Sequence, residues 1–386
     1  MKLVFDVDSI STPLTGIGRY TYELAKQLQM TSALTEIRYL GQRGWVDDLN
    51  QLIKPQTTAH FVQKNPILRP LARIVQQQFK KSVAAYHARH LHDHLYHAPN
   101  FIMRIFGRPS VTTIHDLSHV YFPECHPKER VRFLHRELPK TIAQSTHLIA
   151  VSEHIRQEVI AYYGVKPQHI SAVHHAVANY FKPRNEHELL PVLAPFQLKP
   201  KQYLLAVATL EPRKNVERLL YAYEKLDETI KKHCPLVLVG TKGWLNHSLE
   251  QTIHMLSRKN QIKYLGYVSE NELAFLYAGA AAFAFPSLYE GFGFPVLEAM
   301  ASGTPVLTSN RSSLPEVAGE AAKLINPEDI DAISSGLEQV LTDNTFREKA
   351  ISAGLEQARQ FTWAKCALNT IQVYKKTLST QKPSSP

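Results

Sequence analysis

A strand-loop-helix corner is predicted by the stretch Ala284-Phe285-Pro286-Ser287-Leu288-Tyr289-Glu290-Gly291-Phe292-Gly293-Phe294-Pro295-Val296-Leu297-Glu298-Ala299-Met300-Ala301. Gly291 and Gly293 can adopt backbone angles that other residues avoid, and Pro295 suits a first helical turn, where its missing N–H is not needed. Backbone N–H groups at a helix start favour a negatively charged, oxygen-rich ligand. Glu290 and Glu298 lie at the two ends of this corner and can accept hydrogen bonds from ligand hydroxyls. The structural alternative is a solvated Glu290 and a surface ion pair at Glu298.

The composition is that of a globular protein with room for two domains. The chain has 386 residues, of which 44% are hydrophobic and 20% charged. Its three cysteines are far apart and form no C-x-x-C pair, which favours a reducing compartment over a disulfide framework or a zinc site. The N-terminus resembles no signal peptide and no apolar run is long enough to span a membrane, so we expect a cytoplasmic location. The net charge of +10 suits an anionic partner.

Strands alternate with helices along the chain, which predicts an α/β fold with parallel sheets. We expect strands at residues 3–8, 37–40, 95–98, 111–116, 147–152 and 170–177 in the first half, and at 203–208, 236–239, 262–265, 281–285, 305–308 and 322–325 in the second. The periodicity lapses between them, where prolines gather. The prediction is therefore two doubly wound, Rossmann-like units: an N-terminal domain at 1–182, a linker at 183–200, a C-terminal domain at 201–362, and a final segment at 363–386 with a frayed tail.

The segment Thr15-Gly16-Ile17-Gly18-Arg19-Tyr20 joins the first strand to the first helix. Glycines at this point let backbone amides approach a phosphate. The segment also resembles the start of a dinucleotide-binding fingerprint, with Glu36 near the position of a ribose-binding acid. Thr21 replaces the third glycine, however, and the loop at 9–15 is too long for the tight fingerprint turn. A nicotinamide-dependent oxidoreductase is thus a remote alternative.

Polar residues follow two other predicted strands of the first half. His115 and Asp116 end an apolar strand, and ligands of open α/β sheets bind at the carboxyl ends of strands. The alternative for His115 is a cap for the following segment. His97 and Asn100 lie at the end of the preceding strand and can line the same edge of the sheet.

In the second half, the segment Thr209-Leu210-Glu211-Pro212-Arg213-Lys214-Asn215 closes a strand and opens a helix. The cations of Arg213 and Lys214 can hold a diphosphate and offset the charge of a leaving group. The alternative is an ordinary basic helix start, although positive charge there opposes the helix dipole. Tyr267 and Val268 lie in a further loop between a strand and a helix.

Two patterns suggest metal ligands at first sight. His87, His90, His94 and His97 have spacings of 3, 4 and 3, which would align them on one helix. Residues 95–98 follow a strand pattern instead, so we expect no metal site there. Asp6-Val7-Asp8 has the D-x-D form of metal-dependent transferases, but it lies within the first strand, where core geometry and loop capping explain it better.

The E-x7-E spacing of Glu290 and Glu298, with Gly303-Thr304-Pro305-Val306 and Leu314-Pro315-Glu316-Val317 after it, resembles the signature of retaining GT-B glycosyltransferases of the GT4-like family. The Thr-Gly-Ile-Gly-Arg-Tyr and Thr-Leu-Glu-Pro-Arg-Lys-Asn forms are most similar to mannosyl- and rhamnosyltransferases of lipopolysaccharide O-antigen or exopolysaccharide assembly. The resemblance implies two Rossmann-like domains facing a central cleft. It also implies a last helix that starts near Trp363 and crosses back to the first domain.

The resemblance also implies roles for individual residues. Catalytic roles fall on His115, Glu290, Arg213 and Lys214. Donor-binding roles fall on Gly16, Gly18, Tyr267, Val268, Gly291, Phe292, Gly293, Phe294 and Glu298. Glu298 would hold the ribose hydroxyls, and Glu290 the donor sugar or the oxocarbenium-like centre. His97 and Asn100 are assigned to the acceptor side of the site. Thr209 stands where many members have an arginine, so Arg213 is assigned that arginine's role.

The implied activity is transfer of mannose or a related hexose from a GDP-sugar to a glycan or lipid-linked oligosaccharide, with a UDP-sugar as the alternative donor. No cofactor, divalent metal or covalent nucleophile is expected. A nucleic-acid-binding protein would explain the charge but not the paired glutamates, and no basic stripe with interleaved aromatic residues is present. The helix expected at 67–89 has a basic face, which is either solvated or in peripheral contact with the inner membrane.

Overall fold

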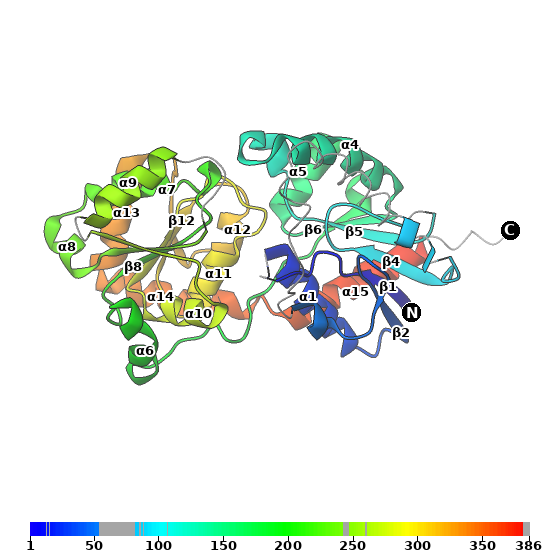
Figure 1. Ribbon diagram of the computed structural model, residues 1–386, viewed down its shortest axis with the longest axis horizontal. Coiled ribbons are helices and arrows are strands. Elements are labelled where there is room, and N and C mark those ends of the chain that lie inside the picture. The colour runs from blue at the N-terminus through cyan, green and yellow to red at the C-terminus, as the bar shows by residue number, and fades with distance from the viewer. Residues whose placement is uncertain are drawn as a thin grey trace, which may run out of the picture. The chain divides into compact units, whose positions relative to one another are not determined.

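The computed structural model describes residues 1–12, 14, 16–53, 82–84, 86–87, 89–105, 107–241, 247–258 and 261–380. The chain divides into two compact units (Figure 1). Unit 1 consists of Met1–Leu117, Pro127–His175 and Trp363–Pro386, and unit 2 of Ser118–His126 and Ala176–Thr362. Most of the helix expected at 67–89 and the tail expected to fray at 381–386 lie outside the described residues.

Unit 1 is built on a sheet with the strand order β3-β2-β1-β4-β5-β6-β7. The strands are β1 (Lys2–Asp6), β2 (Glu36–Leu40), β3 (Trp45–Val46), β4 (His94–Ala98), β5 (Ser110–Ile114), β6 (His147–Ala150) and β7 (Ile170–Ala172). The pairs are parallel except for β2 with the short β3. Because the order reverses between β1 and β4, the loops after these strands lie where ligands of such sheets bind.

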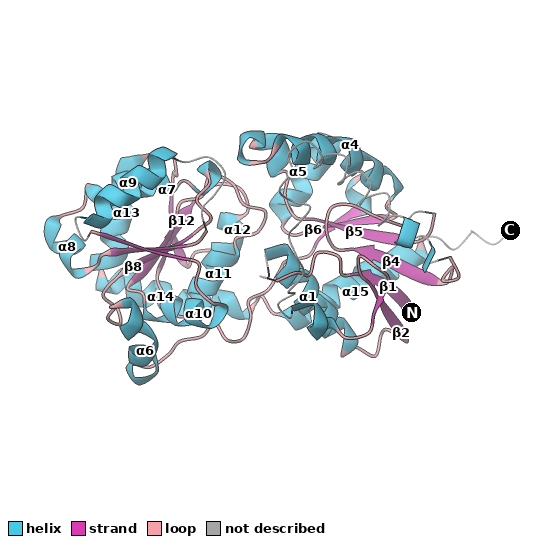
Figure 2. Cartoon of the chain, viewed as in Figure 1, coloured by secondary structure: helices cyan, strands magenta, loops and turns pink. Residues whose placement is uncertain are grey.

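Helices cover the sheet of unit 1 (Figure 2). They are α1 (Gly16–Gln29), η1 (Leu49–Ile53), α4 (Lys128–Gln144), α5 (Glu153–Tyr163), η4 (Pro167–His169) and α15 (Trp363–Ser379). The C-terminal helix α15 packs against α1 and against β5 and β6. The last helix therefore belongs to unit 1, which also contains the first strand.

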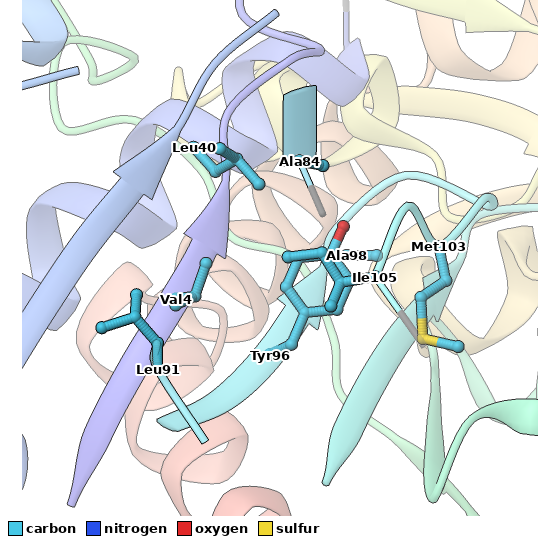
Figure 3. Close-up of a cluster of buried hydrophobic side chains, with 8 residues drawn as sticks. All are labelled: Val4, Leu40, Ala84, Leu91, Tyr96, Ala98, Met103 and Ile105. Carbon is cyan, nitrogen blue, oxygen red and sulfur yellow. The ribbon is translucent and has the colours of Figure 1, made fainter. Parts of the chain in front are cut away.

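The core of unit 1 explains the D-x-D pattern of the first strand. Val4 of β1 packs with Tyr96 of β4 in a cluster of buried side chains (Figure 3). The hydroxyl of Tyr96 donates to Asp6 Oδ2 over 2.8 Å, and Arg104 Nε donates to the same oxygen over 2.6 Å. The backbone N–H of Asp8 donates to Asp6 Oδ1. Asp6 is therefore a core carboxylate with a paired charge, in agreement with the structural interpretation.

Unit 2 has a fully parallel sheet with the order β10-β9-β8-β11-β12-β13. The strands are β8 (Leu204–Val207), β9 (Leu236–Val239), β10 (Ile262–Gly266), β11 (Ala282–Phe285), β12 (Val306–Ser309) and β13 (Ala322–Ile325). This is the Rossmann order, in which the chain reverses direction between the neighbouring strands β8 and β11. The loops that carry Arg213 and Glu290 follow these two strands.

The helices of unit 2 lie on both sides of its sheet (Figure 1). They are α3 (Ser118–Tyr121), η3 (Pro123–Cys125), α6 (Glu186–Leu193), η5 (Ala194–Phe196), η6 (Pro212–Lys214), α7 (Val216–Glu224), α8 (Glu228–His233), α9 (His247–Arg258), α10 (Glu270–Gly279), α11 (Phe294–Ala301), α12 (Leu314–Ala318), α13 (Ile330–Thr342) and α14 (Asn344–Arg359). α7 packs with α13, and α11 packs with α14 and α12.

The range 183–200, which we expected to be a linker, is an ordered part of unit 2. It holds α6, which starts with a capping box between Asn185 and Glu188. Leu189 and Leu193 are buried and lie where a side chain on Gly279 of α10 would be. The prolines that suggested a linker instead lie before, within and after a short helix.

The predicted strands match the observed ones closely. Among the described residues, the short β3 is a strand that the sequence did not indicate. The Rossmann-like α/β class is confirmed. In the part of the chain that the structure describes, no helix is long and apolar enough to cross a membrane.

Candidate active site

The corner between β11 and α11 has the geometry that its glycines indicate. Gly293 is the residue before α11 and has a φ of 115°, in the left-handed region that favours glycine. A Cβ at this position would lie 2.9 Å from Leu314 Cδ2. Pro295 occupies the first turn of the helix. The corner therefore needs glycine for both its backbone angle and its packing.

Glu290 lies at the centre of a charged cluster with Arg213 and Lys214. Lys214 Nζ donates to Glu290 Oε1 over 2.6 Å, and Arg213 Nη1 donates to Oε2 over 3.2 Å. Ser287 Oγ donates to Oε1 over 2.7 Å. Arg213 Nη2 donates to Glu211 Oε1 over 2.6 Å. Two neighbouring strand ends thus bring two cations and two carboxylates together, and their formal charges sum to zero.

The backbone around this cluster is also fixed. The N–H of Leu288 donates to the carbonyl of Arg213, and Ser287 Oγ lies 3.0 Å from the same carbonyl oxygen. Asn215 has a left-handed φ of 59°, and its Nδ2 donates to the carbonyls of Pro286 and Pro327. The turn from η6 into α7 is therefore tied to the loop after β11, and Arg213 and Lys214 project from a constrained backbone.

Burial and charge act in opposite directions on Glu290, which is 8% exposed. Burial raises the pKa of the Glu290 carboxyl, while the charges of Lys214 and Arg213 lower it, and the cations prevail so that the pKa lies below its usual value. Glu290 is therefore ionised at neutral pH. The carboxylate in turn holds both cations in place without a ligand.

Serines from the loop after β12 hold the main chain of the corner. Ser312 Oγ accepts from the N–H of Glu290, and Ser313 Oγ donates to the carbonyls of Glu290 and Phe292. The rings of Phe292 and Phe294 meet edge to face, with centroids 5.5 Å apart. Glu298 lies on α11 just beyond its first turn and is buried. Gly291 belongs to the same loop.

The loop after β10 has one exposed and one buried residue. Gly266 ends the strand with a φ of 70°. Tyr267 is 62% exposed, whereas Val268 is buried. Ser269 caps α10 through a capping box with Glu272. This loop lies beside the end of β9, since the N–H of Gly240 donates to the carbonyl of Gly266.

In unit 1, α1 begins at Gly16, and Gly18 is buried within its first turn. Tyr20 of the same helix packs edge to face on His115, with ring centroids 5.1 Å apart. The start of α1 and the end of β5 are therefore neighbours, as expected for residues of one site. Thr15 lies outside the described residues.

His115 is buried and has a defined tautomer. Its Nε2 lies 2.7 Å from the carbonyl oxygen of Pro99, which can only accept, so Nε2 carries the proton. Burial lowers the pKa of His115 to about 4. The ring is thus neutral at pH 7, and Nδ1 has a lone pair that can accept a hydrogen bond.

The assignment of His97 to the acceptor side is wrong. His97 is fully buried in unit 1, with Nδ1 2.7 Å from the hydroxyl of Tyr374 and Nε2 2.9 Å from Thr113 Oγ1. Burial lowers its pKa to about 3. Its two nitrogens bond to core hydroxyls, so the residue joins β4 and β5 to α15. Asn100, by contrast, is exposed after β4.

The four spaced histidines do not share a helix. His94 and His97 both belong to β4. The ring of His94 lies beside Asp93 and Glu36, away from the partners of His97. Among the described residues, no group of three or more histidine, cysteine or acidic side chains is arranged to hold a metal ion.

Sequence reasoning identified Arg213, Lys214 and Glu290 but not all of their neighbours. Glu211 and Ser287 were not singled out, although both bond directly to the cluster. The signal for Glu211 was its position two residues before Arg213. Residues 118–126 were also missed as part of unit 2, because nothing in their sequence shows which unit they contact.

The two Rossmann-like units and the charged cluster describe the candidate site, and comparison with known proteins gives the class of the protein. Residues 194–357 match the family model of group 1 glycosyl transferases, and residues 14–178 match that of glycosyltransferase family 4. O-antigen chain mannosyltransferase B of Escherichia coli is 38% identical over 383 residues, which cover 97% of this chain and 100% of the relative. The chain belongs to the family 4, group 1 glycosyltransferases and is a hexosyltransferase.

Solved structures show the same GT-B fold. WaaG, a glycosyltransferase involved in lipopolysaccharide biosynthesis, is 16% identical with a TM-score of 0.72, over 96% of this chain and 99% of WaaG. HepE of Anabaena, solved with UDP-glucose, is 17% identical with a TM-score of 0.67, over 98% of this chain and 100% of HepE. These structures confirm the expected fold. The family models and the Escherichia coli relative confirm the expected enzyme class.

Proposed function

We propose that this glycosyltransferase moves mannose from GDP-mannose, with retention of anomeric configuration, onto a glycan or lipid-linked acceptor of O-antigen assembly. The Escherichia coli relative that matches along the whole chain supports mannose as the sugar. The cluster of Glu290, Arg213 and Lys214 at the ends of β8 and β11 carries the proposal. It places two fixed cations where the ligands of a Rossmann sheet bind.

Arg213 and Lys214 would hold the donor diphosphate. The hydrogen bond to Glu290 uses one of the three N–H donors of the Lys214 ammonium, so phosphate oxygens have donors to engage. The cations are already oriented before the donor arrives. They therefore stabilise the charge that develops on the departing nucleotide with little reorganisation. Gly16 and Gly18, with the amides at the start of α1, would contribute to the same phosphates.

The two glutamates have separate proposed roles. The carboxylate of Glu290 accepts from Lys214, Arg213 and Ser287. A carboxylate accepts about four hydrogen bonds, so Glu290 can also accept from a donor sugar hydroxyl. Glu298 would hold the ribose hydroxyls. The amides of Gly291 to Phe294 would face the donor phosphates or sugar.

In the proposed reaction, the acceptor oxygen bonds to the anomeric carbon on the face from which the nucleotide leaves. The bond from that carbon to the phosphate oxygen breaks, and the departing phosphate takes up the acceptor proton. No covalent nucleophile and no divalent metal take part, because Arg213 and Lys214 supply the positive charge. His115 is neutral, and its Nδ1 would accept a hydrogen bond from a hydroxyl of the donor sugar near the reacting carbon.

A UDP-sugar is the rival donor. Tyr267 and Val268 would contact the base through backbone groups, which do not discriminate between guanine and uracil. HepE, which shares the fold, was solved with UDP-glucose. Peripheral contact with the cytoplasmic face of the inner membrane is a further part of the proposal, and it rests on the net charge of +10.

A thermal-shift panel tests the donor. GDP, UDP, ADP and their sugars are each added in the presence of a chelator, because a ligand that binds only the folded state raises its unfolding midpoint. We expect GDP and GDP-mannose to give the largest shifts. A larger shift with UDP-sugars would replace the GDP proposal, and shifts that appear only with a divalent metal would overturn the metal-free mechanism.

The configuration of the product is tested separately. Nuclear magnetic resonance of the glycan made from GDP-mannose should show an α-linked mannose, as in the donor. A β-linked product would contradict retention.

A further inference from the structure

Residues 118–126, which we call the arm, belong to unit 2 although their neighbours on both sides belong to unit 1. The chain leaves unit 1 after Leu117 and returns to it at Pro127. The arm contains α3 and η3 and begins three residues after His115. It is thus a segment of the N-terminal half that is built into the unit holding Arg213 and Glu290.

The arm is a compact turn with its own internal bonds. The N–H of Phe122 donates to the carbonyl of Ser118, and the N–H of Cys125 to that of Phe122. Pro123 starts η3, where its fixed φ suits a helical turn. Ser118 Oγ and His126 Nε2 lie 2.8 Å apart and connect the two ends. The arm therefore presents its side chains from a preformed backbone.

The arm contacts the cation cluster through Tyr289. The rings of Tyr121 and Phe122 lie against Tyr289, with centroid distances of 5.8 and 5.5 Å. The carbonyl of Tyr289 accepts from Arg213 Nη1 over 2.7 Å. The side chain of Arg213 is therefore linked to the arm. Cys125, at the end of η3, is 2% exposed.

We propose that the arm is a positioning element of the donor site: Phe122 fixes Tyr289, whose carbonyl holds the side chain of Arg213, and arm docking and donor binding favour each other. The inference rests on the proposed function, in which Arg213 and Lys214 hold the donor diphosphate. The arm touches no reacting atom. It acts through Tyr289, against which it packs.

Such a coupling must be reciprocal. If the docked arm improves donor affinity by some factor, the donor must favour arm docking by the same factor. Two independent measurements should therefore agree. One is the affinity of GDP for an arm variant, and the other is the protection of Cys125 by GDP.

The first measurement is the alkylation rate of each cysteine in the intact wild-type protein, resolved by peptide mass spectrometry. Cys125 is buried in the docked arm, so a ligand that favours docking should protect its thiol. We expect saturating GDP to slow its alkylation at least about fivefold. Cys366, buried in α15 of unit 1, and the partly exposed Cys234 serve as internal controls. Equal slowing of Cys125 and Cys366 would indicate global stabilisation and would overturn the coupling.

The second measurement uses Phe122→Ala, which removes the ring that packs on Tyr289. We expect Phe122→Ala to raise the Kd for GDP by the same factor by which GDP slows the alkylation of Cys125. Phe122→Leu should restore most of the affinity. Tyr162→Ala, which truncates an exposed aromatic residue of α5, is the matched control and should bind as the wild type does.

The outcomes separate this inference from the proposed function. If GDP binds, Arg213→Ala weakens it, and neither Cys125 protection nor Phe122→Ala has an effect, the arm is not coupled to the donor and the inference fails alone. If GDP neither binds nor protects Cys125, the proposed donor site fails and the inference fails with it.

Discussion

At the scale of single residues, Glu290 is the group on which the site depends. Its carboxylate is buried and accepts from both cations and from Ser287. Taking one partner from a buried charged pair costs on the order of 3–5 kcal/mol, because the other charges stay buried without full compensation. A change at Glu290 therefore affects both folding stability and the positions of Arg213 and Lys214.

Glu290→Gln keeps the size of the side chain and removes its charge. We expect kcat to fall by a factor on the order of 10²–10³, since the cations lose their orientation toward the developing charge. Glu298→Gln should instead raise the Kd of the donor more than it lowers kcat. Steady-state kinetics and calorimetry on the two variants check this division. An affinity loss confined to Glu290→Gln, with a turnover loss confined to Glu298→Gln, would reverse the two assignments.

The sequence predicted the charged residues better than their environment. Arg213, Lys214 and Glu290 belong to short local motifs, so their types and spacing were visible. His97 was misassigned because its burial depends on Tyr374, 277 residues further along the chain. Ser287 and Glu211 were missed because a hydrogen bond across a loop has no signal in one-dimensional spacing.

At the scale of elements, the corner between β11 and α11 depends on one glycine conformation. Gly293 combines a φ of 115° with close contact to Leu314. Any side chain there would strain the backbone and displace the start of α11. The amides of this corner and the position of Glu298 both depend on that start.

Gly293→Ala should therefore destabilise the protein by about 1–3 kcal/mol and weaken donor binding. Gly107→Ala is the matched control, because Gly107 also has a positive φ, of 77°, but no atom lies within 4 Å of its Cβ position. The control has the backbone strain without the steric clash, and it belongs to unit 1 rather than to the unit that contains the corner. Thermal unfolding and GDP titration measure both effects. Donor affinity equal to the wild type in Gly293→Ala would show that the corner does not bind the donor.

Elements were predictable where local pattern and burial agree. The central strands β9 and β11 are continuous apolar runs, because a parallel sheet is covered on both faces. The linker at 183–200 was wrong because α6 is short and its prolines hid the helical spacing of Leu189 and Leu193. The arm was not foreseen, since its place in unit 2 depends on the ring of Tyr289 more than 160 residues away.

At the scale of the whole molecule, buried neutral histidines should make folding sensitive to acid. Burial lowers the pKa of His97 to about 3 and those of His115 and His147 to about 4. In the unfolded chain these groups have pKa values near 6.5. As the pH falls below 6.5, the unfolded state binds protons that the folded state does not, so the free energy of unfolding falls. The loss levels off below each folded pKa.

We therefore expect the thermal midpoint to fall progressively from pH 7.5 to pH 5. The full titration of His115 alone corresponds to about 3 kcal/mol. Glu290 does not contribute in this window, because its lowered pKa means that its stabilising charge is lost only below about pH 4.5. Scanning calorimetry at several pH values checks this prediction. A midpoint that stays constant over this range would contradict the buried, neutral state of the histidines.

Arg213 and Lys214 are proposed to hold the donor diphosphate without a metal. Calorimetric titration of the protein with GDP, in the presence of a chelator, measures this directly. The wild type should bind under these conditions. Lys214→Ala should raise the Kd at least about tenfold, because it removes a charge-assisted contact to phosphate. If Lys214→Ala bound GDP as tightly as the wild type, Lys214 would not hold the diphosphate. If the wild type bound GDP only after a divalent metal was restored, the metal-free site would be wrong.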